Sequence, residues 1–253
     1  MGIIIFLIIL VVIWQGAYWI FVDILEVFKS YVLPSPIGVA ERFIDLCQSG
    51  TLLHATGFSL ARGFLGYIIA IAIGLVIGLL LYRFKYLQKN LKPIILGMQT
   101  LPSVCWVPFS ILWFGLTTQA ILFVVVMGSA FSIAISIDNA IKNVPPIYKK
   151  AALTMGAKKS QLFLKVIMPA SLPELISGLK QGWSFAWRAL MAGEVMTTSI
   201  GLGQTLITGR DLADINQIML VMIIIIVVGI LIDKCFFTTL ERHILKKRGL
   251  LTE

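Results

Sequence analysis

Charged residues are scarce in this chain. Asp, Glu, Lys and Arg make up only 13% of its 253 residues, whereas hydrophobic residues make up 58%. Soluble domains carry about 25% charged residues, so this composition excludes soluble enzymes and soluble binding modules. A segment that crosses a bilayer must satisfy its backbone hydrogen bonds internally, which favours helices. The sequence therefore predicts an all-α integral membrane protein.

Cysteine and histidine are also rare, with three and two residues, and neither forms a metal-binding pattern. The segment GAKKS at residues 156–160 lacks the other glycines of a phosphate-binding loop, so we expect no nucleotide to bind this chain. The apolar segments contain no paired nucleophile and base. We therefore expect no metal, no cofactor and no catalytic residue in the chain, which is then not an enzyme.

Long apolar runs, by contrast, recur along the sequence. A helix needs roughly 20 mostly apolar residues to cross a bilayer, and about six segments meet this condition. We expect membrane spans over residues 3–21, 58–82, 91–114, 119–140, 172–197 and 218–237. The first has no preceding Lys or Arg and no small-residue cleavage site, so we expect a retained helix and not a signal peptide. The third contains Pro93, Pro102 and Pro108, which kink a helix and are tolerated beside a water-filled cavity.

These segments predict a chain of four parts. Residues 1–30 form an N-terminal transmembrane helix, residues 31–57 an extracytoplasmic amphipathic segment, residues 58–240 a five-helix core, and residues 241–253 a basic cytoplasmic tail. The core includes a polar loop at residues 143–168.

Lys and Arg gather in alternate connections between the spans. The connections at residues 83–92 and 142–165 and the segment 234–248 are rich in Lys and Arg, whereas the other connections are mostly acidic. Short cytoplasmic connections are enriched in Lys and Arg, so we expect both termini to be cytoplasmic. Anionic inner-leaflet lipid accounts for the net charge of +9, and no nucleic-acid partner is predicted.

The polar loop at residues 143–168 has the marks of a helical hairpin. Pro145 and Pro146 are typical of a helix start, Gly156 is typical of a chain reversal with positive φ, and we expect Pro169 to end the hairpin. The expected apolar face consists of Leu153, Leu162, Phe163, Val166 and Ile167. Periodicity alone is equally consistent with a basic hairpin that merely lies on anionic headgroups.

The spacing in this loop resembles the cytoplasmic "EAA" loop of the permease subunits of binding-protein-dependent ABC importers. The positions taken as that loop are Lys150, Ala151, Ala152, Gly156, Ala157, Val166, Met168 and Pro169. Three of them depart from the family pattern, because Lys150 stands where the family usually has Glu, Val166 replaces Ile, and Met168 replaces Leu. The last two keep apolar volume, whereas Lys150 reverses a charge.

Other fragments look like the nitrate, sulfonate and taurine branch of that family. They are LPSP at residues 33–36, PSVCWVPFSILWFG at 102–115, the Trp-Arg and Glu pattern at 187–194, and GLGQ at 201–204. The resemblance implies a type I ABC importer permease fold, with about six transmembrane helices and a cytoplasmic coupling-helix hairpin, in the bacterial inner membrane. It also implies a second permease copy, two ATPase subunits that bind ATP and magnesium, and an extracytoplasmic substrate-binding protein. The expected cargo is a small anion such as a sulfonate, nitrate or taurine, with a vitamin precursor as the alternative.

Two spans carry small or hydroxyl side chains at helical spacing. Gly66, Ala70, Gly74 and Gly78 recur every four residues, which predicts close packing against another helix. The fourth span presents Ser129, Ser132 and Ser136 on one face. These hydroxyls either line a translocation pathway or bond back to carbonyls of their own helix.

The fifth span contains two charged residues, Arg188 and Glu194, at intramembrane positions. Such residues normally face a cavity or a partner, so either a pathway role or a structural ion pair explains them. If Arg188 faces the pathway, it favours a small anion, and Trp183, Trp187 and Trp106 are candidates for the pathway walls. A secondary transporter or channel would also contain buried charge, but it gives no reason for the basic hairpin.

Overall fold

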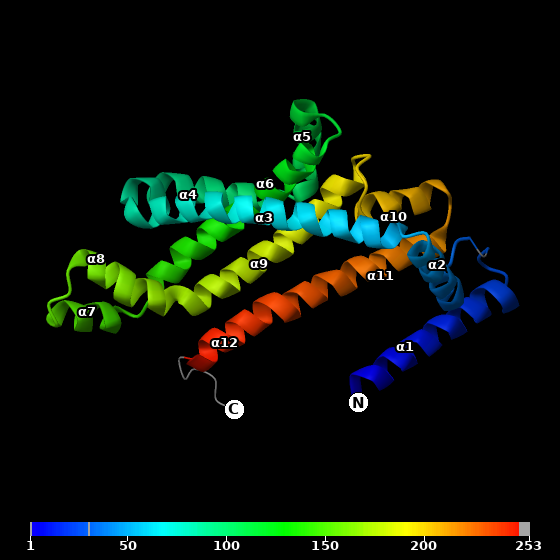
Figure 1. Cartoon of the computed structure of the whole chain (residues 1–253), viewed down its shortest axis with the longest axis horizontal. Helices are drawn as coiled ribbons and strands as arrows, with labels where there is room; N and C mark the ends of the chain where they lie inside the picture. Colours follow the sequence, from blue (N-terminus) through cyan, green and yellow to red (C-terminus); the bar gives the residue numbers. More distant parts are fainter. Residues whose placement is uncertain (1, 30, 248–253) are drawn as a thin grey trace. The chain divides into compact units, whose positions relative to one another are not determined.

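The computed structural model describes residues 2–29 and 31–247, which contain helices and no β-strand (Figure 1). The predicted all-α class is confirmed. Residues 1, 30 and 248–253, and with them the end of the expected basic tail, lie outside the described residues. The α-helices are α1 (Gly2–Tyr18), α2 (Pro36–Gln48), α3 (Thr51–Arg83), α4 (Lys85–Thr100), α5 (Val107–Phe114), α6 (Thr118–Lys142), α7 (Pro146–Thr154), α8 (Lys159–Gln161), α9 (Met168–Val195), α10 (Leu202–Asp211), α11 (Ile215–Ile232) and α12 (Thr239–Lys247). Four short segments have other helical geometry: η1 (Trp19–Ile24), η2 (Ser103–Trp106), η3 (Leu162–Ile167) and η4 (Asp233–Thr238).

Five helical runs in the described part are long and apolar enough to cross a membrane. They are Ile5–Ile24, Thr51–Arg83, Thr118–Lys142, Lys159–Val195 and Ile215–Arg242. These runs correspond to the first, second, fourth, fifth and sixth predicted spans. Most are longer than predicted, because hydropathy marks only the apolar part of a helix and the helix itself continues into polar sequence.

The third predicted span is a bent pair of helices. The run Lys85–Thr100 and the run Ser103–Phe114 meet at 99°, and the break falls at Pro102. Pro93 lies inside α4, and Pro108 lies in the first turn of α5, where a missing N–H costs little. Of the three prolines, Pro102 therefore marks the change of direction.

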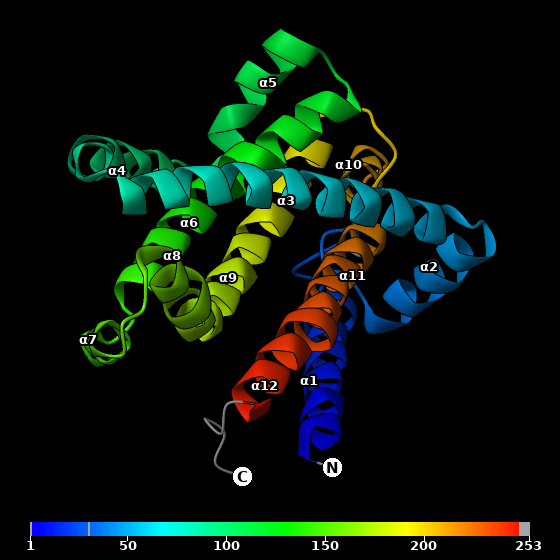
Figure 2. The same ribbon diagram turned by 60° about the vertical axis from the view of Figure 1, so that its left-hand side comes forward.

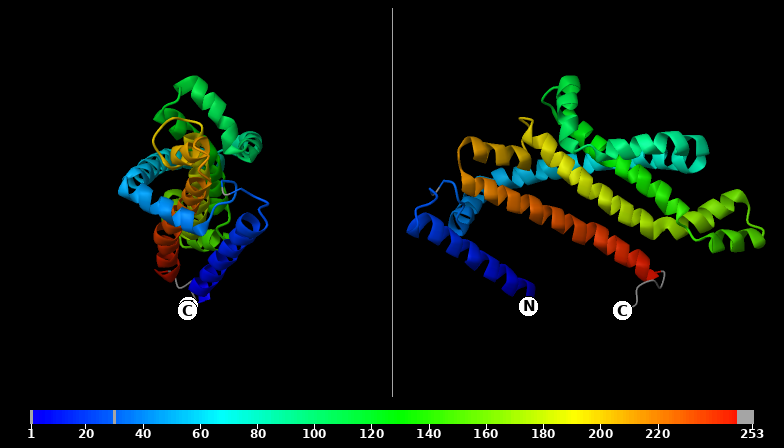
Figure 3. Two further views of the ribbon diagram at one scale, coloured as in Figure 1. Left: turned by 90° about the vertical axis from the view of Figure 1, so that its right-hand side faces the viewer. Right: turned by 180° about the vertical axis from the view of Figure 1, so that it is seen from behind.

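The chain divides into two compact units. The first contains Met1–Leu60 and Glu194–Val228, and the second contains Ala61–Gly193 and Gly229–Glu253. In the first unit, the Ser35 side chain caps α2 by accepting from the Gly38 N–H at 2.9 Å. Arg42 on α2 pairs with Asp214, between α10 and α11, at 2.8 Å. Figure 3 shows α10 and α11 as successive helices joined by this short turn.

The core of the second unit is built on α6, most of which is buried. One side of α6 packs against the small-residue stripe of α3, and we call this contact the α3–α6 seam (Gly66, Ala70, Gly74 and Gly78 against residues 125–137). A Cβ at Gly74 would stand 2.7 Å from Ile133, and a Cβ at Gly78 would stand 2.8 Å from the Ala134 carbonyl. The predicted close packing of the stripe is confirmed.

The other side of α6 packs against α9, and the two helices run side by side (Figure 2). Gly128 on α6 is so close to Ala189 that a Cβ there would lie 2.7 Å from the Ala189 Cβ. Gly178 on α9 is in similarly close contact with Ser136. The helices α7 and α8 lie at the end of this pair, between the last residue of α6 and the first of α9 (Figures 1 and 2).

Candidate functional site

Residues 143–168 fold as the predicted hairpin. The helix α7 begins at Pro146 and ends at Thr154, and the chain reverses at Gly156, whose φ is +81°. The N–H groups of Gly156 and Ala157 donate to the carbonyls of Leu153 and Ala152, at 3.0 Å each. This pattern closes the helix end and requires a left-handed residue, which favours glycine.

The second arm of the hairpin is continuous with the fifth span. Lys159–Gln161 is α-helical, Leu162–Ile167 has π-helical geometry, and α9 follows directly. Pro169 lies in the first turn of α9, at the entry to the fifth span, where the hairpin was expected to end. The wider π turn precedes the proline, whose ring would otherwise clash with the carbonyl four residues earlier. The second arm of the hairpin and α9 therefore form one continuous helical path.

Two side-chain contacts and one buried side chain attach the hairpin to the rest of the second unit. Phe163 stacks on Tyr82 near the end of α3, with ring centroids 5.9 Å apart. Asn143, which follows α6, donates to the Glu174 carboxylate of α9 at 2.6 Å. Ile167 is buried, with 3% of its surface exposed. The base of the hairpin is thereby held between α3, α6 and α9.

Both arms of the hairpin and its tip, in contrast, expose apolar side chains. The exposed fractions are 65% for Ile147, 55% for Leu153, 87% for Met155 and 66% for Leu164. Leu153, expected on the apolar face of the hairpin, is exposed, and its neighbour Ala152 is the buried residue of α7. The hairpin therefore presents apolar residues together with the lysines, among them the exposed Lys150.

Arg188 lines a cavity of about 280 Å³ in the second unit, beside the bend between α4 and α5. Its Nε donates to the Ser184 carbonyl at 3.1 Å, and its guanidinium lies 4.7 Å from the centre of the Phe185 ring. The lining also contains Gln99, Thr100 and Ser103. Of the predicted pathway residues, Arg188 is the one that reaches this cavity.

The predicted wall residues lie in two aromatic clusters. Trp183 is almost fully buried and stacks on Trp187, with ring centroids 5.9 Å apart, and also on Phe64. Trp106 contacts Phe123 edge-on at 6.4 Å. These tryptophans hold the helices around Arg188 together, and none of the three belongs to the lining of its cavity.

The serines of α6 face other helices. Ser129 is fully buried and donates to the Val125 carbonyl at 2.7 Å, and Ser132 is 2% exposed. Ser136 contacts Gly178 of α9. For Ser129, the structure thus favours the alternative of back-bonding to its own helix.

Glu194 is fully buried in the first unit, at the end of α9. The Ser59 hydroxyl donates to its carboxylate, at 2.9 and 2.7 Å from the two oxygens, and the Gly203 N–H donates at 3.0 Å. The Leu202 N–H donates to the Ser59 oxygen at 2.8 Å. Glu194 thereby orders the GLG segment at the start of α10, which favours its structural role, and two glycines of this segment lie against it.

Three ion pairs in the second unit escaped prediction from the sequence. Asp138 of α6 is fully buried and pairs with Lys142 and with Lys92 of α4, the latter at 2.8 Å. Lys180 of α9 pairs with Asp233 at 3.1 Å. Opposite charges inside apolar segments were a signal in the sequence, but only the fold brings together Lys92 and Asp138, or Lys180 and Asp233, which lie about 50 residues apart along the chain.

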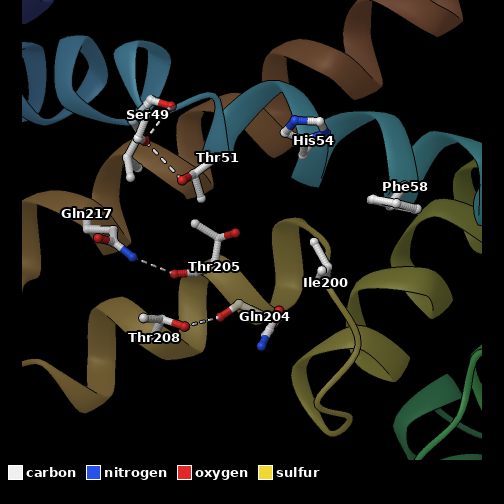
Figure 4. A pocket seen from close by; sticks show the side chains of 10 residues that line it. Ser49, Thr51, His54, Phe58, Ile200, Gln204, Thr205, Thr208 and Gln217 are labelled. Carbon is white, nitrogen blue, oxygen red and sulfur yellow. Dashed lines mark hydrogen bonds between the residues drawn. The ribbon is translucent and has the colours of Figure 1, made fainter.

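The first unit contains a separate cavity of about 480 Å³ (Figure 4). Hydroxyl and amide groups line much of it, including those of Thr51, Gln204 and Thr205, together with His54 and Phe58. The Gln217 amide donates to the Thr205 carbonyl at 2.8 Å and fixes one wall. In the described part of the chain, no group of three or more His, Cys, Asp and Glu residues is arranged to hold a metal ion.

Comparison with known proteins agrees with this architecture. The family described as binding-protein-dependent transport system inner membrane component matches residues 70–246. An aliphatic sulfonates transport permease, SsuC of Bacillus subtilis (strain 168), is 32% identical over 92% of this chain and 84% of its own.

Two further relatives carry different substrate names. The formylaminopyrimidine transport permease ThiX of Halalkalibacterium halodurans is 29% identical over 78% of this chain and 76% of its own. The nitrate import permease NrtB of Synechocystis sp. is 27% identical over 83% and 79%.

Among solved structures, an amino acid ABC transporter chain has a TM-score of 0.67 at 16% identity, covering 79% of this chain and 97% of its own. A chain of the inward-facing MetNI methionine ABC transporter has a TM-score of 0.64 at 22% identity, covering 78% and 97%. These likenesses establish the type I importer fold. The chain belongs to the inner-membrane components of binding-protein-dependent transport systems, as an ABC importer permease of the nitrate and sulfonate branch.

Proposed function

We propose that this permease forms the translocation pathway for a small anion, such as a sulfonate, nitrate or taurine-like solute. Arg188 is the observation that carries the proposal. Its side chain is exposed in the single chain, lies within an apolar helix and lines a cavity. A fixed guanidinium in a membrane attracts anions and repels cations, so it selects the charge of the solute that passes.

In this proposal the hairpin at residues 143–168 couples the pathway to cytoplasmic ATPase subunits. Its exposed apolar tip has the character of a docking surface, and its base continues into α9, the helix that carries Arg188. Closure of the ATPases around ATP and magnesium would move the hairpin, and a rigid helix would pass that motion to the cavity. The chain itself performs no phosphate chemistry.

The proposed assembly contains two copies of this permease, two ATPase subunits and an extracytoplasmic binding protein, in contact with membrane lipid. The enrichment of Lys and Arg in the connections at residues 83–92 and 142–165 and in the segment 234–248 supports cytoplasmic termini. In this arrangement the binding protein sets the affinity for the solute, and Arg188 needs to hold the anion only briefly. A guanidinium at mid-membrane suits brief contact, because a tightly held anion would block transport.

The similarity to ThiX supports a second candidate cargo, a vitamin precursor. Such a solute need not be anionic, so Arg188 distinguishes the two candidates. A secondary transporter is a weaker alternative, since it would operate without ATPase partners.

The test is uptake of radiolabelled sulfonate and nitrate by vesicles that contain the complete importer. Arg188→Gln is expected to lower uptake of either anion at least about tenfold, because one charge-assisted contact is lost. Arg210→Gln is the matched control, since Arg210 is exposed, pairs with the adjacent Asp211 and lies outside the cavity. Unchanged anion uptake in an assembled Arg188→Gln importer would show that Arg188 is structural.

A further inference from the structure

The cavity beside the α4–α5 bend is lined by two chemically different groups of residues. Arg188 and Ser103 provide hydrogen-bond donors, from α9 and from the start of η2. Gln99 and Thr100 come from the last turn of α4 on the other side of the break. The cavity, at about 280 Å³, is at the lower end of ligand pockets, so it suits a small solute.

The Arg188 side chain is held in place by contacts with its own helix. The Arg188 Nε is bonded to the Ser184 carbonyl, and the Phe185 ring supports the guanidinium. These contacts use the Nε–H and leave the two terminal amino groups for a ligand. The terminal groups of a guanidinium bind planar pairs of oxygen atoms on carboxylate, sulfonate or related anions.

Gln99 and Thr100, in contrast, present hydrogen-bond acceptors and therefore require a donor on the ligand. The Gln99 Oε1 is buried and has no hydrogen-bond partner among the described residues. A buried acceptor without a donor costs free energy, which a ligand N–H would recover. Thr100 donates its hydroxyl hydrogen to the Gly97 carbonyl at 2.7 Å, so towards the cavity its oxygen acts as an acceptor.

The end of α4 adds to this preference. The last carbonyls of a helix lack partners within the helix and carry a partial negative charge. The Met98 carbonyl accepts from the Leu101 N–H at 3.2 Å, and the chain then turns away at Pro102 without continuing the helix. A cationic donor is therefore favoured beside Gln99 and Thr100, a few residues along the chain from the anion-binding side.

We propose that this cavity is a subsite for a small zwitterion, with Arg188 and Ser103 binding its anionic group and Gln99 and Thr100 binding its ammonium group. The inference rests on the proposed anion pathway and narrows its cargo to solutes such as an aminoalkanesulfonate. Gly128 forms part of the lining, where a Cβ would stand 3.3 Å from Ser103, so glycine keeps the space beside Ser103 open.

The experiment compares two sulfonates of similar size that differ in the amino group. Taurine and ethanesulfonate compete for the purified permease–ATPase complex in detergent, without binding protein, and the ratio of their dissociation constants is measured. The native complex is expected to prefer taurine about tenfold, the effect of one hydrogen bond to a charged group. Gln99→Leu should abolish the preference, Gln99→Glu should keep it, and Arg188→Gln should weaken both ligands.

The outcomes separate this inference from the function on which it rests. Equal binding of the two sulfonates by the native complex, or a preference that survives in Gln99→Leu, overturns the zwitterion subsite and leaves the anion pathway intact. No uptake of taurine, ethanesulfonate or nitrate by an assembled importer that contains its binding protein and hydrolyses ATP overturns the anion pathway itself. Size-exclusion chromatography of each variant complex establishes that it is assembled.

Discussion

The α3–α6 seam and the hairpin at residues 143–168 both depend on glycine, but for different physical reasons. In the seam, a Cβ at Gly78 would lie 2.8 Å from a backbone carbonyl of the neighbouring helix. In the hairpin, Gly156 has no atom within 4 Å of a built Cβ, and it is the φ of +81° that requires glycine. The seam is thus a tight contact between helices, whereas the hairpin is an open reversal whose tip is free to meet a partner.

The largest expected loss of stability comes from adding a side chain at a glycine of the α3–α6 seam. Gly78→Val places a Cβ and two methyl groups against α6, where the Ala134 carbonyl and Ile137 leave no space. We expect the free energy of unfolding to fall by about 3 kcal/mol or more, because α3 and α6 must separate. Thermal unfolding in detergent measures the change.

Gly57→Val is the matched control, because Gly57 is in the same helix and a Cβ there meets no atom within 4 Å. We expect it to change stability by less than about 0.5 kcal/mol. Similar losses in the two variants would mean that helix propensity, and not the close approach of α6, sets the cost at Gly78.

A smaller loss of stability is expected at Asp138, near the end of α6 that precedes the hairpin. Asp138→Asn removes the buried charge that Lys92 and Lys142 share, and leaves two ammonium groups beside a neutral amide. The lysine side chains are 23% and 28% exposed, so they partly reach water. We expect a loss of about 1–3 kcal/mol of unfolding free energy, less than for a fully buried pair.

Asp211→Asn is the control for this charge, since Asp211 is 61% exposed and pairs with its neighbour Arg210. Its removal should cost less than about 1 kcal/mol. If Asp138→Asn costs no more than Asp211→Asn, the buried ion pairs do not anchor α4 to α6.

The smallest effect on stability is expected at the hairpin tip. Lys150→Glu restores the charge that the related permeases usually carry, at an exposed position, so stability should change by less than about 0.5 kcal/mol. Because the partner surface is expected to match Lys150, the affinity for the ATPase should fall about threefold to tenfold. Co-purification at increasing salt measures the affinity, and Lys89→Glu, which reverses an exposed charge on α4, is the control. Equal affinities for the two variants would show that Lys150 makes no contact with the partner.

The features that could be predicted were those marked by residues close together in the sequence. The apolar runs predicted the spans, the four-residue spacing of small residues predicted the seam, and the two prolines with Gly156 predicted the hairpin. Each of these signals depends on residues less than one helix apart, so local periodicity is sufficient.

Features that depend on tertiary packing were not predicted. The sequence contains three prolines between residues 91 and 114, and only the fold selects Pro102 as the bend. Asp138 likewise pairs with Lys92 of another helix, and Glu194 accepts from Ser59 of α3. The sequence likewise does not show that Ala152 packs inward while its neighbour Leu153 is exposed.

The most direct test of the central claim, that the hairpin couples ATP hydrolysis to the pathway, is the amount of solute imported per ATP hydrolysed by the reconstituted Gly156→Pro importer. Proline fixes φ near −65° and removes the N–H that donates to the Leu153 carbonyl, so the reversal at Gly156 must change. Gly115→Pro is the control, because Gly115 also has positive φ and a donating N–H, but lies outside the hairpin. The account predicts that import per ATP falls at least about tenfold in Gly156→Pro and much less in Gly115→Pro. An assembled Gly156→Pro importer that transports as much solute per ATP as the native protein would contradict it.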